Sequence, residues 1–246
     1  MALFEWHECI AKIKPYVFQI FTPDGSGTGW LLRNSASGTL CSVVTAAHVI
    51  DHAHYWEEPI RLTHTESGIS LLLRPADRAI SSDSATDTAA LLFDRATLEL
   101  PHDALPLIKK GFILKPGVEI GWLGFPAVAR SSLCFFSGHI SACIESDSSY
   151  LVDGVAINGV SGGPAFRRIS DGTELVGLVS AYIPNRATGD VLPGVALIRD
   201  VDNLHDVIER FKSLAEAKTE ETKRTEPPPP QPTETDGGTK TSKKGG

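Results

Sequence analysis

Two features typical of membrane and secreted proteins are missing from this sequence. No uninterrupted apolar stretch approaches the ~20 residues that a helix needs to cross a bilayer. The first residues, Met1 to Glu8, are acidic, and they lack the basic segment followed by an apolar one that marks a secretory signal. We therefore expect a cytoplasmic protein without a membrane partner.

Cysteine and clustered basic residues are also scarce. None of the four cysteines lies in a C-x₂-C pair of the kind that binds zinc, so we expect no metal and no cofactor. Reduced thiols fit the cytosol, although a bridge between Cys134 and Cys143 stays open. The net charge is −7 and no Lys/Arg block exceeds two residues. Nucleic acid is not an expected partner, because phosphate binding needs a concentrated basic face.

What the sequence has instead is a series of short β-prone runs bounded by turn residues. Runs of this kind without helices between them are typical of a β-barrel or sandwich, not of a doubly wound α/β sheet. The sequence therefore predicts an all-β fold, with strands at 16–22, 29–32, 40–45, 60–63, 69–73, 89–93, 118–123, 135–141, 150–152, 175–181 and 195–198.

The two ends of the chain differ from this β-rich middle. Apolar residues at helical spacing predict a short N-terminal helix within 1–14, which Pro15 ends. A second apolar stripe predicts a helix at 201–217. The segment 218–246 is rich in Pro, Thr and Lys and has nothing to bury, so we expect a disordered tail. The domain boundaries follow as 15–217, with lobes of roughly 15–110 and 111–200.

The stretch from Asn158 to Pro164 places Ser161 among three glycines. A serine held on such a turn, beside converging peptide N–H groups, suits a nucleophile with an oxyanion hole. A glycine-rich tight turn explains the glycines equally well. The nucleophile hypothesis requires a base and an orienting acid elsewhere in the chain.

His48 and Asp87 are the candidates for those roles. His48 follows a buried strand, and Asp87 leads directly into the apolar run 89–93. A histidine can take the serine proton and return it to the leaving group, while a buried carboxylate fixes its tautomer. Asp77 and Asp83 are alternative acids, but no apolar strand follows either as directly.

Three histidines close together, His48, His52 and His54, could also suggest a metal site. No neighbouring Cys or Glu completes a recognisable ligand set around them. We expect His52 and His54 to be exposed loop residues, and we assign no metal ligands.

Six segments in order resemble the trypsin/chymotrypsin-type serine peptidases, in particular the HtrA-like branch. They are 25–30 (GSGTGW), 45–49 (TAAHV), 87–91 (DTAAL), 137–142 (SGHISA), 156–164 (AINGVSGGP) and 175–180 (LVGLVS). The resemblance covers roughly residues 15–212. It implies two six-stranded antiparallel β-barrels with the active site between them. It also implies His48 as general base, Asp87 as orienting acid, Ser161 as nucleophile, and the N–H groups of Gly159 and Ser161 as the oxyanion hole.

The same resemblance implies a substrate-binding site. Val155 and Ala156 would line the primary specificity pocket, Asn158 its rim, and Ser180 and Tyr182 would offer main-chain hydrogen bonds to an extended peptide. No carboxylate lies at the expected pocket floor, so we expect small or medium apolar side chains there. The Tyr182 ring would either narrow the pocket or turn to solvent.

Three departures from the resembled family matter. Val160 stands where the digestive members carry the aspartate that pairs with a newly cut N-terminus, so that activation route is not expected. Val49 replaces a disulfide cysteine of the secreted trypsins. HtrA-like enzymes usually continue into a PDZ domain, and we expect none here, because the sequence passes into the expected tail.

Two functions are compatible with these residues. The first is a serine endopeptidase that works through an acyl-enzyme. Its partners would be a polypeptide substrate and a regulatory protein. The second is a catalytically silent trypsin-like fold that acts as a peptide-binding or scaffold module. A flipped Gly159 peptide, or a pocket filled by Tyr182, would favour the second.

Overall fold

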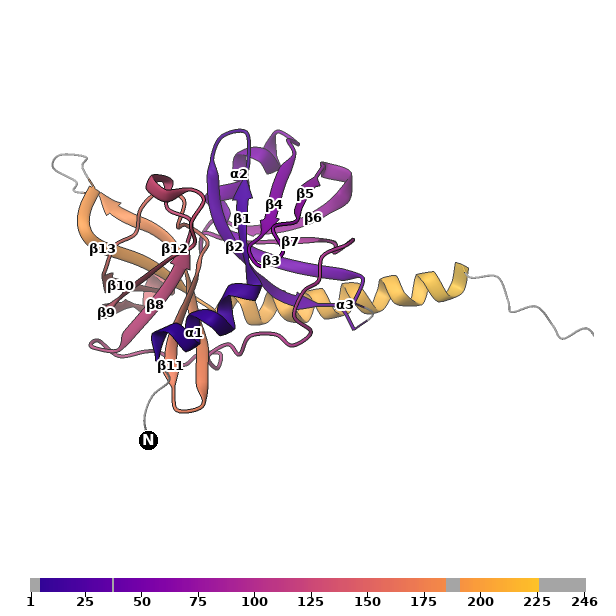
Figure 1. Cartoon of the computed structure of the whole chain (residues 1–246). Helices are drawn as coiled ribbons and strands as arrows, with labels where there is room; N and C mark the ends of the chain where they lie inside the picture. The colour runs from indigo at the N-terminus through magenta and orange to yellow at the C-terminus, as the bar shows by residue number, and fades with distance from the viewer. Residues whose placement is uncertain (1–4, 37, 185–190, 226–246) are drawn as a thin grey trace, which may run out of the picture.

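The chain folds into two β lobes that lie side by side, with helices at both ends (Figure 1). The computed structural model describes residues 5–36, 38–184 and 191–225, with the backbone alone for 181–184, 191–193 and 218–225. The predicted all-β architecture in two lobes is confirmed. Within the described residues, no helix is long and apolar enough to cross a membrane.

The first lobe is a seven-stranded antiparallel sheet in the order β5-β4-β1-β2-β3-β7-β6. Its strands are β1 (Val17–Phe21), β2 (Ser26–Asn34), β3 (Leu40–Ala46), β4 (Ile60–His64), β5 (Ser70–Leu73), β6 (Arg78–Asp83) and β7 (Thr88–Asp94). Apolar side chains of these strands form one core, which includes Phe18, Leu31, Leu62 and Phe93. This lobe thus has one strand more than the six expected, because β6 was not foreseen.

The second lobe is a closed six-stranded barrel in the order β10-β13-β12-β11-β8-β9. Its strands are β8 (Glu119–Gly124), β9 (Cys134–Ile144), β10 (Ser149–Asp153), β11 (Pro164–Ile169), β12 (Gly172–Pro184) and β13 (Val191–Asp200). Trp122 and Phe166 are among the largest fully buried side chains of its core. The sequence did not predict β11, which begins with a proline and carries two arginines.

The N-terminal helix α1 (Trp6–Ile13) packs against the second lobe and is not a separate unit. Cys9 and Ile13 are fully buried in the core of that lobe. The centroids of the Trp6 and Phe135 rings lie 5.1 Å apart. The guanidinium carbon of Arg168 lies 4.4 Å from the centroid of the Trp6 ring. The predicted boundary at residue 14 therefore separates two segments that share one core.

The C-terminal helix α3 (Asp202–Thr225) runs past the first lobe and projects beyond it (Figure 1). Leu204 and Phe211 anchor its first half, as the predicted apolar stripe requires. The helix continues eight residues beyond the predicted end at 217, so the expected tail boundary falls inside it. The rest of that tail, 226–246, lies outside the described residues.

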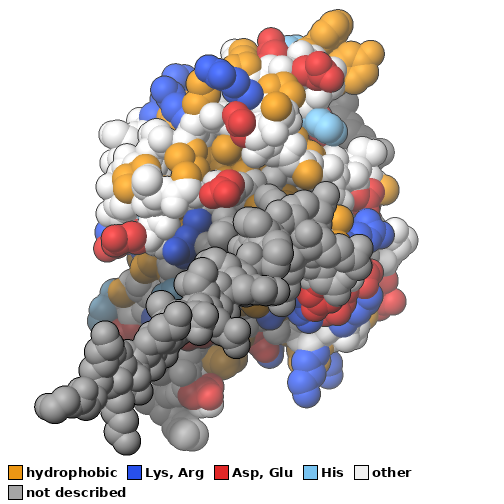
Figure 2. All heavy atoms as spheres, turned by 90° about the vertical axis from the view of Figure 1, so that its right-hand side faces the viewer, with side chains coloured by type: hydrophobic (Ala, Val, Ile, Leu, Met, Phe, Trp, Pro, Cys, Tyr) orange, Lys and Arg blue, Asp and Glu red, His pale blue; other side chains and the backbone are white. Residues whose placement is uncertain are grey.

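One further element was not predicted, the helix α2 (Ala47–Tyr55) that follows β3. His52 and His54 are exposed as expected, but they lie on this helix and not in a loop. The four cysteines are free thiols, so Cys134 and Cys143 are not bridged. Figure 2 shows the face of the molecule from which α3 projects. The described acidic and basic side chains on this face are interspersed.

Candidate functional site

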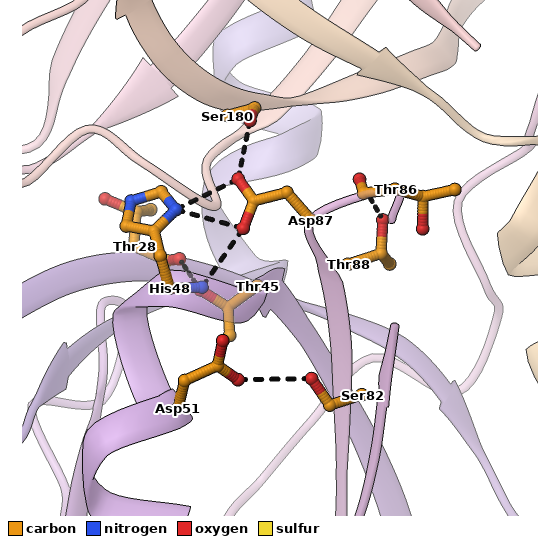
Figure 3. Close-up of polar contacts among 9 residues, drawn as sticks. All are labelled: Thr28, Thr45, His48, Asp51, Ser82, Thr86, Asp87, Thr88 and Ser180. Atoms are coloured by element: carbon orange, nitrogen blue, oxygen red, sulfur yellow. Dashed lines mark hydrogen bonds and ion pairs between the residues drawn. The ribbon is translucent and has the colours of Figure 1, made fainter. Parts of the chain in front are cut away.

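Strand pairing brings His48 and Asp87 together. The last residue of β3, Ala46, pairs with the first residue of β7, Thr88. This pairing places Asp87, just before β7, close to His48, which follows β3 by two residues. The Nδ1 atom of His48 lies 2.9 and 3.0 Å from the two carboxylate oxygens of Asp87 (Figure 3). The backbone N–H of His48 also donates to Asp87 Oδ1 at 3.0 Å. The carboxylate is thus anchored to both the ring and the start of α2.

Asp87 receives a third donor from the other lobe. The hydroxyl of Ser180, on β12, donates to Asp87 Oδ2 at 2.5 Å (Figure 3). Burial alone would raise the pKa of Asp87, but the hydrogen bonds from His48 and Ser180 outweigh it and hold this pKa below the ordinary 3.8. Asp87 also has a left-handed φ of +49°, which a non-glycine residue keeps only when its surroundings fix it.

The two alternative acids do not reach His48. Asp77 accepts from the backbone N–H of Arg74 at 3.0 Å and caps a short 3₁₀ turn. Asp83 accepts from Ala85 N at 3.0 Å and from the Thr86 hydroxyl at 2.9 Å, which shapes the loop leading to Asp87. Both carboxylates therefore stabilise local turns.

Ser161 lies in a tight loop between β10 and β11 that is wedged against the first lobe. The N–H of Thr28, on β2, donates to Ser161 O at 2.9 Å. A Cβ built on Gly162 would lie 2.1 Å from Thr45 Oγ1 and 2.8 Å from Ala46 N, so only glycine allows this approach to the end of β3. Ser161 itself is half-buried, and its hydroxyl makes no hydrogen bond to any residue the structure describes.

The peptide groups between Asn158 and Gly162 show which N–H groups remain unpaired. Asn158 O accepts from Ala127 N at 2.7 Å, Gly159 O from the Thr28 hydroxyl at 2.8 Å, and Val160 O from Gly163 N at 3.0 Å.

Two N–H groups of this loop are also paired: Val160 N donates to Ile157 O, and Gly162 N donates to Val179 O. Within the described part of the chain, the N–H groups of Gly159 and Ser161 have no acceptor. Gly159 is buried and Ser161 is half-buried, and buried N–H groups are rarely left unpaired, so these two donors are free to bind a further acceptor.

The orientation of the Asn158–Gly159 peptide follows from its carbonyl. In a trans peptide the C=O and the N–H point in opposite directions. Because Ala127 N binds Asn158 O, the Gly159 N–H points away from Ala127. Gly159 has a φ of +91°, and a Cβ there would lie 2.3 Å from Phe125 O. Glycine is therefore required for this arrangement.

The residues predicted to bind substrate are only partly described. The Val155 side chain is 44% exposed and Asn158 is exposed, whereas Ala156 is buried. The indole N–H of Trp122 donates to Val155 O at 3.2 Å, which holds the backbone at Val155 against the core of the second lobe. The side chain of Tyr182 lies outside the described residues.

The two valines that depart from the resembled family both have apolar surroundings. Val160 is fully buried in the core of the second lobe. A Cβ built on Gly27 would lie 2.6 Å from Val49 Cγ1, so these two residues are in direct contact.

Two residues that contact the candidate site through their side chains were not predicted from the sequence. Ser180 was predicted to act through its main chain, and its hydroxyl contact with Asp87 was not foreseen. Thr28 was noted only as one letter of a glycine-rich motif. A buried polar residue between glycines, where two strands approach closely, was the available signal for Thr28.

No metal centre is found among the described residues, where no three His, Cys, Asp or Glu side chains gather. His52 forms an ion pair with Glu58 at 3.1 Å.

Comparison with known proteins places the fold. No protein-family model matches the chain, and no curated protein matches it. Among solved structures, the serine endoprotease from Yersinia pestis has a TM-score of 0.62 at 18% identity, over 87% of this chain and 68% of its own. Deg5 has a TM-score of 0.60 at 19% identity, over 82% and 94%.

The protease Rv3671c from M. tuberculosis H37Rv is a third neighbour, in the inactive form of a serine-to-alanine mutant. Its TM-score is 0.57 at 16% identity, over 87% of this chain and 96% of its own. Likeness at such identities shows the fold. The chain therefore has the trypsin-like fold of the HtrA/Deg-family serine proteases.

Proposed function

We propose that this protein is a serine endopeptidase that hydrolyses peptide bonds through an acyl-enzyme formed on Ser161. The observation that carries the proposal is that the N–H groups of Gly159 and Ser161 have no acceptor among the described residues. The same loop contacts the end of β3 through Gly162, and β3 leads directly to the His48 ring that Asp87 holds. Gly159 is buried and Ser161 is half-buried, and a tight turn without a function would not need to leave two such donors without acceptors.

His48 is the proposed base. Its Nδ1 faces the Asp87 carboxylate at 2.9 Å, so Nδ1 carries the proton and Nε2 stays available for the hydroxyl proton of Ser161. Asp87 stabilises the imidazolium that forms when this proton is taken. The proton then passes to the leaving amine, and a water molecule repeats the cycle to release the acyl group.

The N–H groups of Gly159 and Ser161 are the proposed oxyanion hole. In the tetrahedral intermediate, the former carbonyl oxygen carries a negative charge, and fixed donors stabilise it without reorganisation. Typical losses on removing one such donor are about 10²–10³ in kcat.

The proposed substrate is an extended polypeptide with a small or apolar side chain at the primary site. β11 pairs with β12 only as far as Leu178, so among the described residues β11 leaves the edge of β12 from Ser180 onward unpaired on that side. Strand addition along Ser180 to Tyr182 would align the peptide with Ser161. Val155 and Ala156 would contact its primary side chain, and Asn158 would lie at the rim.

Labelling with a fluorophosphonate probe tests this function. The wild-type protein should be labelled and should cut unfolded casein, whereas S161A and H48A should do neither. S170A is the control, because Ser170 is exposed in the turn between β11 and β12. A wild type that is neither labelled nor active at pH 6–9 would instead indicate the silent, peptide-binding module.

Regulation by a protein partner is the remaining part of the proposal. The S161A protein should retain substrates and partners that the wild type releases, and mass spectrometry of the captured proteins identifies them. Recovery of nothing but bulk unfolded protein would contradict a narrow substrate range and a dedicated partner.

A further inference from the structure

Thr28 is a fully buried residue at the contact between the two lobes. Its hydroxyl donates to Gly159 O at 2.8 Å and accepts from Phe125 N at 3.0 Å. Its backbone N–H donates to Ser161 O at 2.9 Å, and its carbonyl accepts from the Thr45 hydroxyl at 2.7 Å. Every polar atom of Thr28 is thus bonded, and two of the bonds go to the loop that carries Ser161.

The glycines on either side explain how Thr28 reaches this loop. A Cβ on Gly27 would lie 3.1 Å from Ser161 O, and a Cβ on Gly29 would lie 2.9 Å from Val44 O. The small residue at 27 lets β2 approach the loop, and the small residue at 29 lets β2 lie close to β3. The threonine between them is the residue whose side chain enters the gap.

We infer that Thr28 is a positioning residue for the oxyanion hole. This inference rests on the proposed function. Glycine at 159 has no Cβ and can adopt backbone conformations closed to other residues, so the sequence of the loop alone does not fix its peptides. The Thr28 hydroxyl donates to the carbonyl oxygen of Gly159, and the backbone N–H of Ala127 donates to the carbonyl oxygen of Asn158. With both carbonyls held, the N–H of Gly159 has one direction.

The second donor is fixed through the backbone of Thr28. The N–H of Thr28 binds Ser161 O, and Gly163 N binds Val160 O, so the peptides before and after Ser161 are held as well. Thr28 therefore bonds the carbonyl oxygen of each residue that carries a donor, Gly159 and Ser161. It touches neither substrate nor the reacting atoms in this scheme and acts only through Gly159 and Ser161.

Three variants separate this role from a general loss of stability. T28V keeps the shape of the side chain and removes the hydroxyl, whereas T28S keeps the hydroxyl. T173V is the matched control, because Thr173 is a buried threonine on β12 whose hydroxyl also donates to a backbone carbonyl, Arg167 O at 3.2 Å.

Steady-state kinetics on a peptide substrate should show T28V with kcat lowered roughly tenfold to a hundredfold and KM nearly unchanged, because a donor displaced by about 1 Å loses that much. T28S should stay within roughly threefold of wild type, since its hydroxyl can make both bonds. T173V should keep the wild-type kcat. Equal kcat in T28V and wild type, or equal losses in T28V and T173V, would overturn the inference.

A second measurement does not depend on activity, so it separates this inference from the proposed function. In ¹⁵N-glycine-labelled protein, the Gly159 amide resonance, assigned by its absence in G159A, should shift in T28V and stay in place in T173V. An unmoved Gly159 resonance in T28V refutes the inference, whether or not the wild type cleaves peptides. If T28V does not fold, T28A takes its place in both assays. If that also fails, the wild-type Thr28 hydroxyl proton decides: slow exchange with solvent supports the bond, and fast exchange refutes it.

Discussion

Replacing Gly159 by alanine perturbs the proposed oxyanion hole directly. The residue has a φ of +91°, where a Cβ costs about 1–2 kcal/mol. The new Cβ would also lie 2.3 Å from Phe125 O, although real contacts of a Cβ are not shorter than 3.0 Å. The loop must therefore move by about 0.7 Å, and the Ala127–Asn158 hydrogen bond that orients the Gly159 N–H moves with it.

The expected result is a large loss of kcat with a modest loss of stability. A displacement of this size at a reacting centre lowers the rate roughly tenfold to a hundredfold, whereas KM should change little. G117A is the matched control, because Gly117 has a φ of +88° and nothing within 4 Å of its Cβ position. Both variants should lower the melting temperature, by roughly 2–4 °C for each kcal/mol of strain. Only G159A should lose activity.

The assay compares kcat, the labelling rate with a fluorophosphonate and the melting temperature of the three proteins. If G159A keeps the wild-type kcat, the Gly159 N–H does not stabilise the intermediate. If G117A loses as much kcat as G159A, the loss reflects stability and not the position of the donor. Either result refutes the reasoning.

Four further predictions follow from the contacts of Asp87 and from Cys41. D87N should lower kcat by about 10⁴, because an amide at this place favours the wrong tautomer of His48; a loss below tenfold would refute this. Because the folded pKa of Asp87 lies below 3.8, its carboxylate stabilises the fold above that pH, and this contribution is lost as the pH falls through the folded pKa. Denaturation curves at pH 2–6 should show this loss in the wild type, and D87N should not show it. S180A should raise the pKa of Asp87 and lower the unfolding free energy at pH 7 by about 1.5–3 kcal/mol, and an unchanged denaturation midpoint would contradict it. Burial raises the pKa of Cys41 to about 12, so iodoacetamide at pH 8 should leave Cys41 unmodified in the native protein, and mass spectrometry of its peptide checks this.

Several parts of the fold were not predictable from local patterns. β6 carries an arginine and two serines, and β11 carries two arginines, in place of a continuous apolar run. They are strands because β7 and β12 offer unpaired edges beside them. The helix α2 begins in a segment that continues an apolar strand, so periodicity gave no sign of the change. Tertiary pairing overrode weak local preference in each case.

The sequence by itself determined that the chain forms short antiparallel strands, and it marked His48, Asp87 and Ser161 as candidates. Turn residues and apolar runs act on neighbours in the chain, so they can be recognised without a structure.

Only the tertiary structure decided which acid faces His48, which hydroxyl supports that acid, and which N–H groups stay unpaired. Those contacts join residues far apart in the chain, such as Ser180 with Asp87 and Thr28 with Gly159. Hydrogen bonds of this kind depend on sub-ångström placement by two separate lobes, and no local pattern encodes that placement.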